Sequence, residues 1–440
     1  MIAIPHRLPP AGPPPGRRRP VPLYAPGPGG NGLHALYERL RAEYGPVAPV
    51  ALAPDLHAWL VLGYREVLLL ARNERDFGRD PRCWNLLREG LVPAGSPLLA
   101  SLGLRPAPPP AGGRRHPRMR AAVTGALARF GGHELGRAVR AAAERLAGSF
   151  AGRREVDLVA HYARRLPLSV LALLLGADER TGWQVAEAAA GAAAVSADSP
   201  DAVRRLERLL GALIAEKRGR PGADVVSLLL AHPAALTDEE VLHSVALTAG
   251  IAHQTTRDWI ASALHVLLTD SAVRSSLDDG RLTVDDVLDL VLWRFPPVQH
   301  LPARYATRDL LLGGQDVRAG DMLVLGLAAA NTDPRALPRG GRPVPGNRAH
   351  TAFGAGPHAC PAQAQARLIV RTAVEVLRNH LPDMELSVPQ EELVWASSPW
   401  ARRLAALPVR PAARRTASAV PCASVPCPSA PCAPPAPEPA

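Results

Sequence analysis

The sequence of 440 residues is poor in cysteine, in aromatic side chains and in long apolar runs. Of its five cysteines, Cys422, Cys427 and Cys432 lie in a C-terminal stretch rich in Pro, Ala and Ser, which leaves Cys83 and Cys360 for the rest of the chain. So few thiols argue against a disulfide framework. No run of about 18 apolar residues occurs, and no compact apolar segment follows the basic N-terminal residues, so we expect neither a membrane span nor a secretory signal. These absences predict a soluble, cytoplasmic protein.

Lysine is absent except for Lys217, and arginine carries the basic charge. Much of the formal net charge of +11 comes from arginines near the two ends, namely Arg7, Arg17, Arg18, Arg19, Arg410, Arg414 and Arg415. The rest of the chain has no basic stripe interleaved with aromatic residues, which make up only 4% of the sequence. The charge therefore does not indicate binding to nucleic acid, and a solvated face or docking to an acidic partner protein accounts for it.

Both ends of the chain are rich in proline. Residues 1–32 and 409–440 have too little apolar surface to fold, so we expect them to be disordered and the folded domain to span residues 33–408. The C-terminal repeat VPCASVPCPSAPC spaces its thiols five residues apart, but it lacks the histidine or the tight turn of a metal knuckle. Exposed, incidental cysteines explain this repeat better than a metal site does.

Helical periodicity dominates the region between the two tails. Helices are predicted at 33–43, 64–72, 118–129, 134–151, 156–175, 200–217, 238–269, 284–294 and 361–380, and short strands at 47–53, 58–63, 304–317 and 404–409. Such a mixture predicts a mainly α fold with a small β region. A chain of this length forms one unusually large domain or two ordinary ones, and it can bury a deep site.

The longest predicted helix begins at the capping box Thr237-x-x-Glu240 and runs to residue 269 without a proline, a length of about 45 Å at 1.5 Å per residue. Apolar residues occur around nearly its whole circumference, which is typical of a helix that crosses the middle of a protein. Its centre nevertheless carries four polar residues at 253–256. We interpret them first as a satisfied internal hydrogen-bond network, and second as the wall of a functional cavity to which Gly250 gives room.

One of the two cysteines outside the tail lies in the stretch TAFGAGPHACPAQAQARLIVRTAVEVL, residues 351–377. A glycine-rich turn with Phe353 and Gly356 precedes Cys360, and Pro361 suits the first position of a helix that runs to residue 380. We expect the pKa of this thiol to be lowered, because backbone N–H groups and the helix dipole stabilise a thiolate at a helix N-terminus.

Such a thiolate can act as a nucleophile, ligate a metal or, as lone cysteines usually do, fill space as a small apolar side chain. His358 lies two residues from Cys360 on the same turn, where its geometry as a general base is awkward. An axial iron ligand needs only a thiolate on a rigid loop, with a backbone that lacks bulk so that a flat macrocycle can approach. The turn meets both conditions.

The stretch FGAGPHAC resembles the haem-ligand loop F-x-x-G-x-x-x-C of the cytochrome P-450 family, and the resemblance extends over about residues 33–408. It implies the family's mainly α fold, a buried haem (heme b) under the long central helix, and Cys360 as the axial thiolate of the iron, on a loop whose other matched positions are Phe353 and Gly356. The family holds the haem propionates with His and Arg side chains, and the matching positions here are His116, Arg120, Arg304 and His358.

The resemblance also identifies a departure in the central helix. Ala252, Gln254 and Thr255 align with a small residue, an acid and a threonine that serve oxygen activation in the family. The threonine can still donate a hydrogen bond to dioxygen. An amide replaces the acid, however, and it cannot release and recover a proton as a carboxyl group does.

A second departure lies in DDVLDLVLWRFPPVQ, which resembles the family's E-x-x-R helix. Val291 takes the place of the glutamate, and Asp289 lies on another face of the helix. We therefore expect Arg294 to find its acceptors among backbone carbonyls of the cysteine loop. A milder change is Ala362, which stands where the family has the glycine of Cys-x-Gly.

The resemblance implies a haem-thiolate monooxygenase that inserts one atom of O₂ into a small apolar organic substrate, in secondary metabolism or in oxidation associated with signalling, with ferredoxin and ferredoxin reductase as electron donors. Its specificity loops are expected in 75–105 and 160–205. Because Gln254 and Val291 both depart from the family pattern, a haem-binding sensor or partner protein with little or peroxide-dependent turnover stays an alternative. In lacking this glutamate, the sequence also resembles an actinobacterial subgroup of the family whose members are encoded beside small signalling GTPases. Such GTPases are therefore candidate partners.

Overall fold

The computed structural model describes residues 20–23, 32–93, 95–102, 115–194, 196–337, 344–397 and 399–411. The helices are α1 (Gly32–Tyr44), α2 (Tyr64–Arg72), α3 (Asn85–Arg88), α4 (Pro97–Ser101), α5 (Arg115–Ala128), α6 (Gly132–Gly148), α7 (Arg165–Leu175), α8 (Glu179–Ala193), α9 (Ser199–Gly219), α10 (Val225–Leu230), α11 (Asp238–Thr269), α12 (Ser271–Asp278), α13 (Val284–Arg294), α14 (Leu327–Asn331) and α15 (Gln363–His380).

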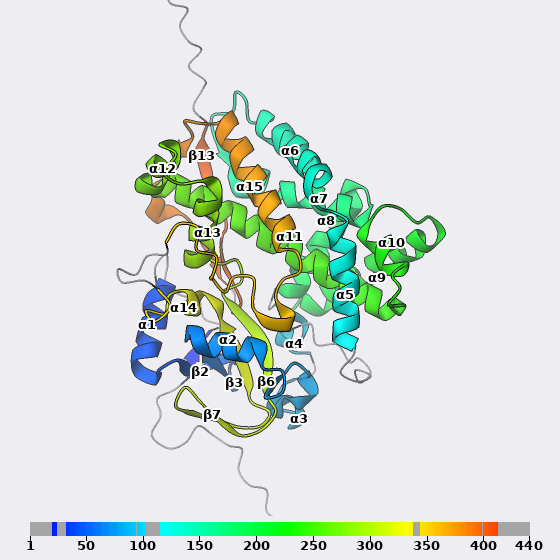
Figure 1. The fold of residues 1–440 in the computed structure, drawn as a ribbon, viewed down its shortest axis with the longest axis vertical. Helices are drawn as coiled ribbons and strands as arrows, with labels where there is room; N and C mark the ends of the chain where they lie inside the picture. The colour runs from blue at the N-terminus through cyan, green and yellow to red at the C-terminus, as the bar shows by residue number, and fades with distance from the viewer. Residues whose placement is uncertain are drawn as a thin grey trace, which may run out of the picture.

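The strands are short by comparison. They are β1 (Val21–Pro22), β2 (Val47–Ala53), β3 (Leu56–Val61), β4 (Phe77–Gly78), β5 (Val156–Asp157), β6 (His300–Ala306), β7 (Leu310–Leu312), β8 (Gln315–Val317), β9 (Met322–Gly326), β10 (Glu385–Leu386), β11 (Trp395–Ser397), β12 (Arg402–Leu404) and β13 (Pro408–Arg410). The predicted fold class, mainly α with a small β region, is confirmed. Figure 1 shows the β region at one end of the molecule and the large helical region at the other.

The main sheet has the strand order β1-β2-β3-β9-β6-β4, in which β3 and β9 run parallel and β9 and β6 antiparallel. Successive side chains of β9 enter different apolar clusters, because residues of a strand alternate between the two faces of a sheet. Met322 and Val324 pack with α1 on one face, and Leu323 and Leu325 pack with α2 on the other. Strand β6, which carries Arg304, lies between β9 and β4 in this sheet, and both faces of the sheet are covered.

The central helix α11 has the predicted bounds, and both halves of its capping box form. The Thr237 hydroxyl accepts from the Glu240 N–H at 3.2 Å, and the Glu240 carboxylate accepts from the Thr237 N–H at 3.0 Å. The helix is packed by α7, α8, α9, α13 and α15, and it runs through the middle of the helical region in Figure 1. This burial explains why apolar residues surround most of its circumference.

The structure corrects several predicted elements. The helix expected at 156–175 is interrupted, because Val156 pairs with Val409 in a small sheet and a π-helical turn, Val159–Ala163, precedes α7. The strand expected at 404–409 is two strands, β12 and β13. The alanine-rich α8 was not predicted, since its alanines give weak periodicity; Asp178 caps it by accepting from the Thr181 N–H at 2.6 Å.

The predicted disordered tails, 1–32 and 409–440, lie largely outside the described residues, and so do Cys422, Cys427 and Cys432. The parts that are described lie in the fold. Strand β1 pairs with β2, Leu23 is buried, and Val409 in β13 is fully buried. Strand pairing thus extends to described residues beyond the predicted boundaries at 33 and 408, which stay a prediction.

The described helices include none that combines the length and the apolar character needed to cross a bilayer.

Candidate active site

Cys360 lies between a short 3-10 turn, η3 (Gly356–His358), and the start of α15. Its backbone N–H donates to the carbonyl of Phe353 at 2.8 Å, which closes the loop. Gly354 and Gly356 have φ of +69° and +67°, a region that glycine adopts without strain. A Cβ on Gly356 would come within 2.4 Å of the carbonyl oxygen of Ala71, so only glycine lets the loop pack against the end of α2.

The expected lowering of the Cys360 pKa is wrong. Burial raises the pKa of the thiol, and this outweighs a hydrogen bond from the Ala362 backbone and the positive charge of Arg120, which act in the opposite direction. The helix begins at Gln363 and not at Pro361, so the helix N-terminus has less influence than predicted. A bound cation is what would favour the thiolate here.

Ala362 has φ of −106°, which any residue adopts without strain, so alanine is tolerated where the family pattern has glycine.

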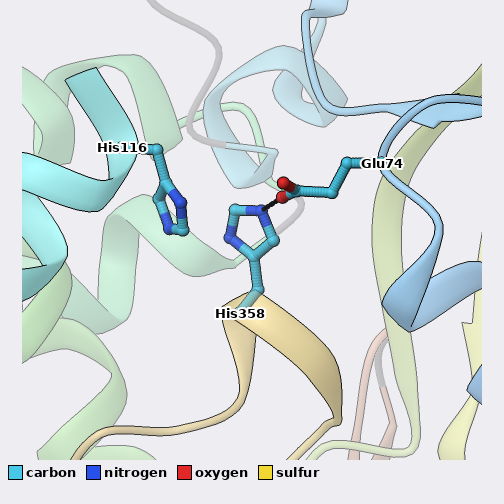
Figure 2. Close-up of side chains that lie close together, drawn as sticks. All are labelled: Glu74, His116 and His358. Atoms are coloured by element: carbon cyan, nitrogen blue, oxygen red, sulfur yellow. Dashed lines mark hydrogen bonds and ion pairs between the residues drawn. The ribbon is translucent and has the colours of Figure 1, made fainter. Parts of the chain in front are cut away.

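Two of the predicted propionate-binding residues meet above this loop. The rings of His116, from α5, and His358, from η3, lie with their centroids 3.9 Å apart. Figure 2 shows the His358 ring between the His116 ring and the carboxylate of Glu74, whose Oε1 lies 2.5 Å from His358 Nε2. The ligand atoms of these three residues lie within 4.8 Å of one another, an arrangement that by itself is also compatible with a metal ion.

The surrounding charges decide against a metal ion. Burial, followed by the positive charges of Arg79 and other cationic neighbours that include Arg304 and Arg120, lowers the pKa of His358 to about 3. Burial and the same three arginines also lower the pKa of His116, against the opposing charge of Glu74. Three fixed positive charges repel a divalent cation and attract carboxylates. The cluster is therefore suited to an anion.

Arg304 supplies the strongest sign of an absent acceptor. It is 2% exposed, and its Nε and Nη1 atoms have no hydrogen-bond partner among the described residues. Burial lowers the pKa of this guanidinium to about 10. Buried donors without partners are costly, so such a group implies an acceptor that completes the site. The two carboxylates at one edge of a haem fit this cluster in charge and in hydrogen-bonding capacity.

The sequence analysis did not identify Arg79 or Glu74 as part of this cluster. Both lie in the segment around β4, and nothing in their local sequence distinguishes them from surface charges. The loop and the cluster thus bring together the seven residues predicted to bind the cofactor, and they add two residues that were missed; the cofactor role of all nine stays a prediction.

The polar residues at the centre of α11 divide between two roles. His253 is buried, and its Nε2 lies 3.2 Å from the carbonyl oxygen of Arg164, but its Nδ1 has no hydrogen-bond partner among the described residues, so the predicted satisfied network is only partly formed at this residue. Burial lowers the pKa of His253 to about 4. Ala252, Gln254 and Thr255 are instead half-buried. These three therefore remain candidates for the distal side of the site.

The structure corrects the expectation that Arg294 binds backbone carbonyls of the cysteine loop. Its Nη1 donates to Asp270 Oδ2 at 3.0 Å. Arg294 is the last residue of α13 and Asp270 is the N-cap of α12, so the pair ties two helix ends together. Val291 is fully buried among apolar residues, and the buried acid of α13 is Asp289.

No protein-family model matches the chain. Among curated proteins, it is 30% identical over 384 residues to the cytochrome P450 monooxygenase PikC of Streptomyces venezuelae, which covers 85% of this chain and 90% of the relative. It is 29% identical over 398 residues to the mycinamicin IV hydroxylase/epoxidase of Micromonospora griseorubida, with 86% and 97% covered. Among solved structures, CYP154C4 from a Streptomyces species has a TM-score of 0.78 at 28% identity and covers 90% of this chain and 99% of its own. CYP154A1 from Streptomyces coelicolor has a TM-score of 0.76 at 28% identity, with 89% and 100% covered.

Proposed function

The chain belongs to the cytochrome P450 family, and on that premise we propose that it is a haem-thiolate monooxygenase in which Cys360 is the axial ligand of the iron. The observation that supports the cofactor assignment is the buried Arg304, two of whose donors have no partner among the described residues and lie among other cations next to the cysteine loop. The dianionic edge of a haem would satisfy these donors, and the Cys360 thiolate would bind its iron.

When bound, a thiolate-ligated haem supplies the reductive activation of dioxygen that places one oxygen atom in a substrate and releases the other as water. The chain's own residues hold and orient the groups around it. Arg304, Arg120 and His116 would donate to the two carboxylates, and His358 would complete their binding from the cysteine loop. Thr255 would offer its hydroxyl on the distal helix, and Ala252, three residues earlier on the same face, would leave room for dioxygen with its small side chain.

An apolar substrate is proposed to lie against the central helix on the side that carries Gln254. Leu247, in the first half of α11, is 54% exposed and precedes Gln254 by about two helical turns on the same side. It is the side chain of this face proposed to contact an apolar ligand. The relatives named above include a hydroxylase/epoxidase of mycinamicin IV, and another is named a vitamin D(3) 25-hydroxylase. We infer a comparably apolar organic substrate, with specificity loops in 75–105 and 160–205.

Electrons are proposed to come from a ferredoxin and its reductase. Nothing in the comparisons favours the alternative of a haem-binding sensor, because the relatives named here are a monooxygenase and hydroxylases.

The experiment that tests this function is the absorption spectrum of the reduced carbon-monoxide complex. The purified wild type should carry one haem per chain and show the strongly red-shifted Soret band of thiolate ligation, and Cys360→Ser should abolish that band. Cys83→Ser is the matched control, because Cys83 is exposed and lies on another element. A wild type that takes up no haem, or a Cys360→Ser variant with an unchanged band, would refute the proposal.

A further inference from the structure

One buried carboxylate in α13 contacts residues on both sides of the cysteine loop. Asp289 is 2% exposed. From the segment that enters the loop, Arg348 Nε donates to Asp289 Oδ2 at 3.3 Å, and His350 Nε2 lies 3.5 Å from Oδ1. From the helix that leaves the loop, Arg367 Nη2 donates to Oδ1. The same side chain therefore links chain segments before and after Cys360.

Arg367, which binds Asp289, also contacts the central helix α11. The guanidinium of Arg367 lies 5.7 Å from the ring centroid of Trp259 in α11. The Trp259 indole donates to the carbonyl of Leu288 at 3.3 Å, and its ring meets that of Phe353 in an edge-to-face contact at 5.7 Å. Phe353 in turn accepts the backbone hydrogen bond of Cys360 at 2.8 Å. Helices α11, α13 and α15 and the ligand loop thus meet around one aspartate.

Of the other candidate groups of α13, only Asp285 shares a partner with Asp289, since its Oδ1 accepts from Arg367 Nη1 at 3.3 Å, but none of the contacts of Asp285 among the described residues reaches the segment that enters the loop. Val291 has no acid to offer, Arg294 is bound to Asp270, and Asp286 is engaged in the capping box with Thr283. Because a buried carboxylate is tolerated only when its acceptor capacity is filled, Asp289 and its donors hold one another in place. Loss of the carboxylate would release the segment that enters the loop and would leave Arg367 with Asp285 alone, so the two flanks would no longer be linked.

We propose that Asp289 is a positioning residue for the iron ligand, whose carboxylate ties the segment entering the Cys360 loop to the helix leaving it. This inference rests on the function proposed above, since the loop positions a ligand only if haem is bound. Asp289 would thus be the buried acid of α13 that holds the loop, since the position of the family's glutamate is occupied by the apolar Val291. The outer partners of a metal ligand commonly alter metal affinity by about 10- to 100-fold when they are replaced.

The test compares Asp289→Asn with Asp278→Asn in the haem-loaded protein. Asp278→Asn is the matched control, because it removes another aspartate that pairs with an arginine of α15, Arg378, but lies on α12 away from the loop. Haem release to an excess of an apoglobin acceptor should be roughly tenfold faster in Asp289→Asn and unchanged in the control. Part of the reduced carbon-monoxide complex of Asp289→Asn should also lose the red-shifted band, and Asp289→Glu should restore it in part.

A second variant covers the case in which Asp289→Asn does not fold. Arg348→Gln removes one donor whose side chain is largely exposed, so it should fold and still release haem faster than the control. Wild-type release rates and spectra in either folded variant would overturn the inference while leaving the function intact. A wild type that takes up no haem would instead overturn both.

Discussion

Arg294 donates a hydrogen bond to Asp270 at 3.0 Å, so the arginine that ends α13 is tied to the first turn of α12. Both side chains are about one-third exposed, which screens their interaction. We therefore expect Arg294→Gln to lower the free energy of unfolding by only about 0.5 kcal/mol. Haem content should be unchanged.

The measurement is chemical unfolding of wild type and Arg294→Gln together with their haem-to-protein ratio. Loss of haem in this variant would show that Arg294 supports the loop by a route other than the pair with Asp270.

The buried guanidinium near the cysteine loop should be needed for haem retention. Arg304→Gln removes a fixed positive charge and two unpartnered donors from the cluster, so haem release should be roughly tenfold faster. Arg308→Gln is the control, because Arg308 lies just after the same strand but is largely exposed and pairs with Asp76. Equal release rates in the two variants would argue against a carboxylate ligand at this cluster.

The amide at position 254 should limit proton supply. Cleavage of the O–O bond of dioxygen consumes two protons, and Thr255 can relay a proton that Gln254 cannot replenish. Gln254→Glu should raise the product formed per electron consumed, and Thr255→Ala should lower it about tenfold. Peroxide-driven turnover of the wild type should be comparatively better, because the oxidant brings its own protons.

The measurement is product and peroxide formed per electron for the three proteins on one substrate. Tight coupling in the wild type, without a gain from Gln254→Glu, would mean that another group feeds protons. Asp258, a buried acid one helical turn beyond Gln254, would then be the first residue to replace.

Two buried histidines should make the protein less stable in mild acid. Burial lowers the pKa of His253 and that of His300 to about 4 each. In the unfolded chain a histidine titrates near 6.5, so below that pH the unfolded state takes up protons that the folded state does not. Stability is therefore lost as the pH falls from about 6.5 towards 4, by about 2 kcal/mol per histidine at pH 5.

This prediction is checked by urea unfolding at pH 7 and pH 5. His300→Gln should reduce the difference between the two pH values by about 2 kcal/mol. His133→Gln, at an exposed position on α6, should leave the difference as in the wild type. An unchanged difference in His300→Gln would mean that other groups dominate the acid response.

The N-terminal boundary of the fold should lie before residue 21. A chain of residues 20–411 should bind haem as the full chain does, whereas removal of Val21–Leu23 as well should lower the midpoint of thermal unfolding. Strand β1 covers the edge of β2, and Leu23 is 8% exposed, so their loss exposes apolar surface worth about 1 to 2 kcal/mol. If the two shortened chains unfold at the same temperature, residues 21–23 do not stabilise the fold, and the boundary lies at residue 33 as the sequence predicts.

What the sequence predicts well depends on local signals. The capping box at Thr237 and the long run without proline define α11 to the residue, and the glycine turn before Cys360 identifies the ligand loop. Arg294 and Asp270 are 24 residues apart, and Asp289 and Arg367 are 78 apart. No periodicity or cap encodes such pairs, since tertiary packing brings them together.

The Cys360 pKa illustrates the same division. The sequence indicates a nearby helix N-terminus, which is a local feature that lowers a thiol pKa. Burial comes from elements distant in the chain, and it raises the pKa of this thiol instead.

The cationic cluster draws its members from both parts of the molecule, with Arg304 on the sheet, His116 on a helix of the helical region and His358 on the loop between them. Arg304, Arg79 and Arg120 repel one another when no dianion lies among them. A dianion bound among them would offset this repulsion, so the acidic edge of a haem would hold the β region and the helical region together where they meet. Amide hydrogens along β6 and the start of α5 should accordingly exchange more slowly once haem is bound, and haem uptake would then stabilise the fold as well as supply the active site.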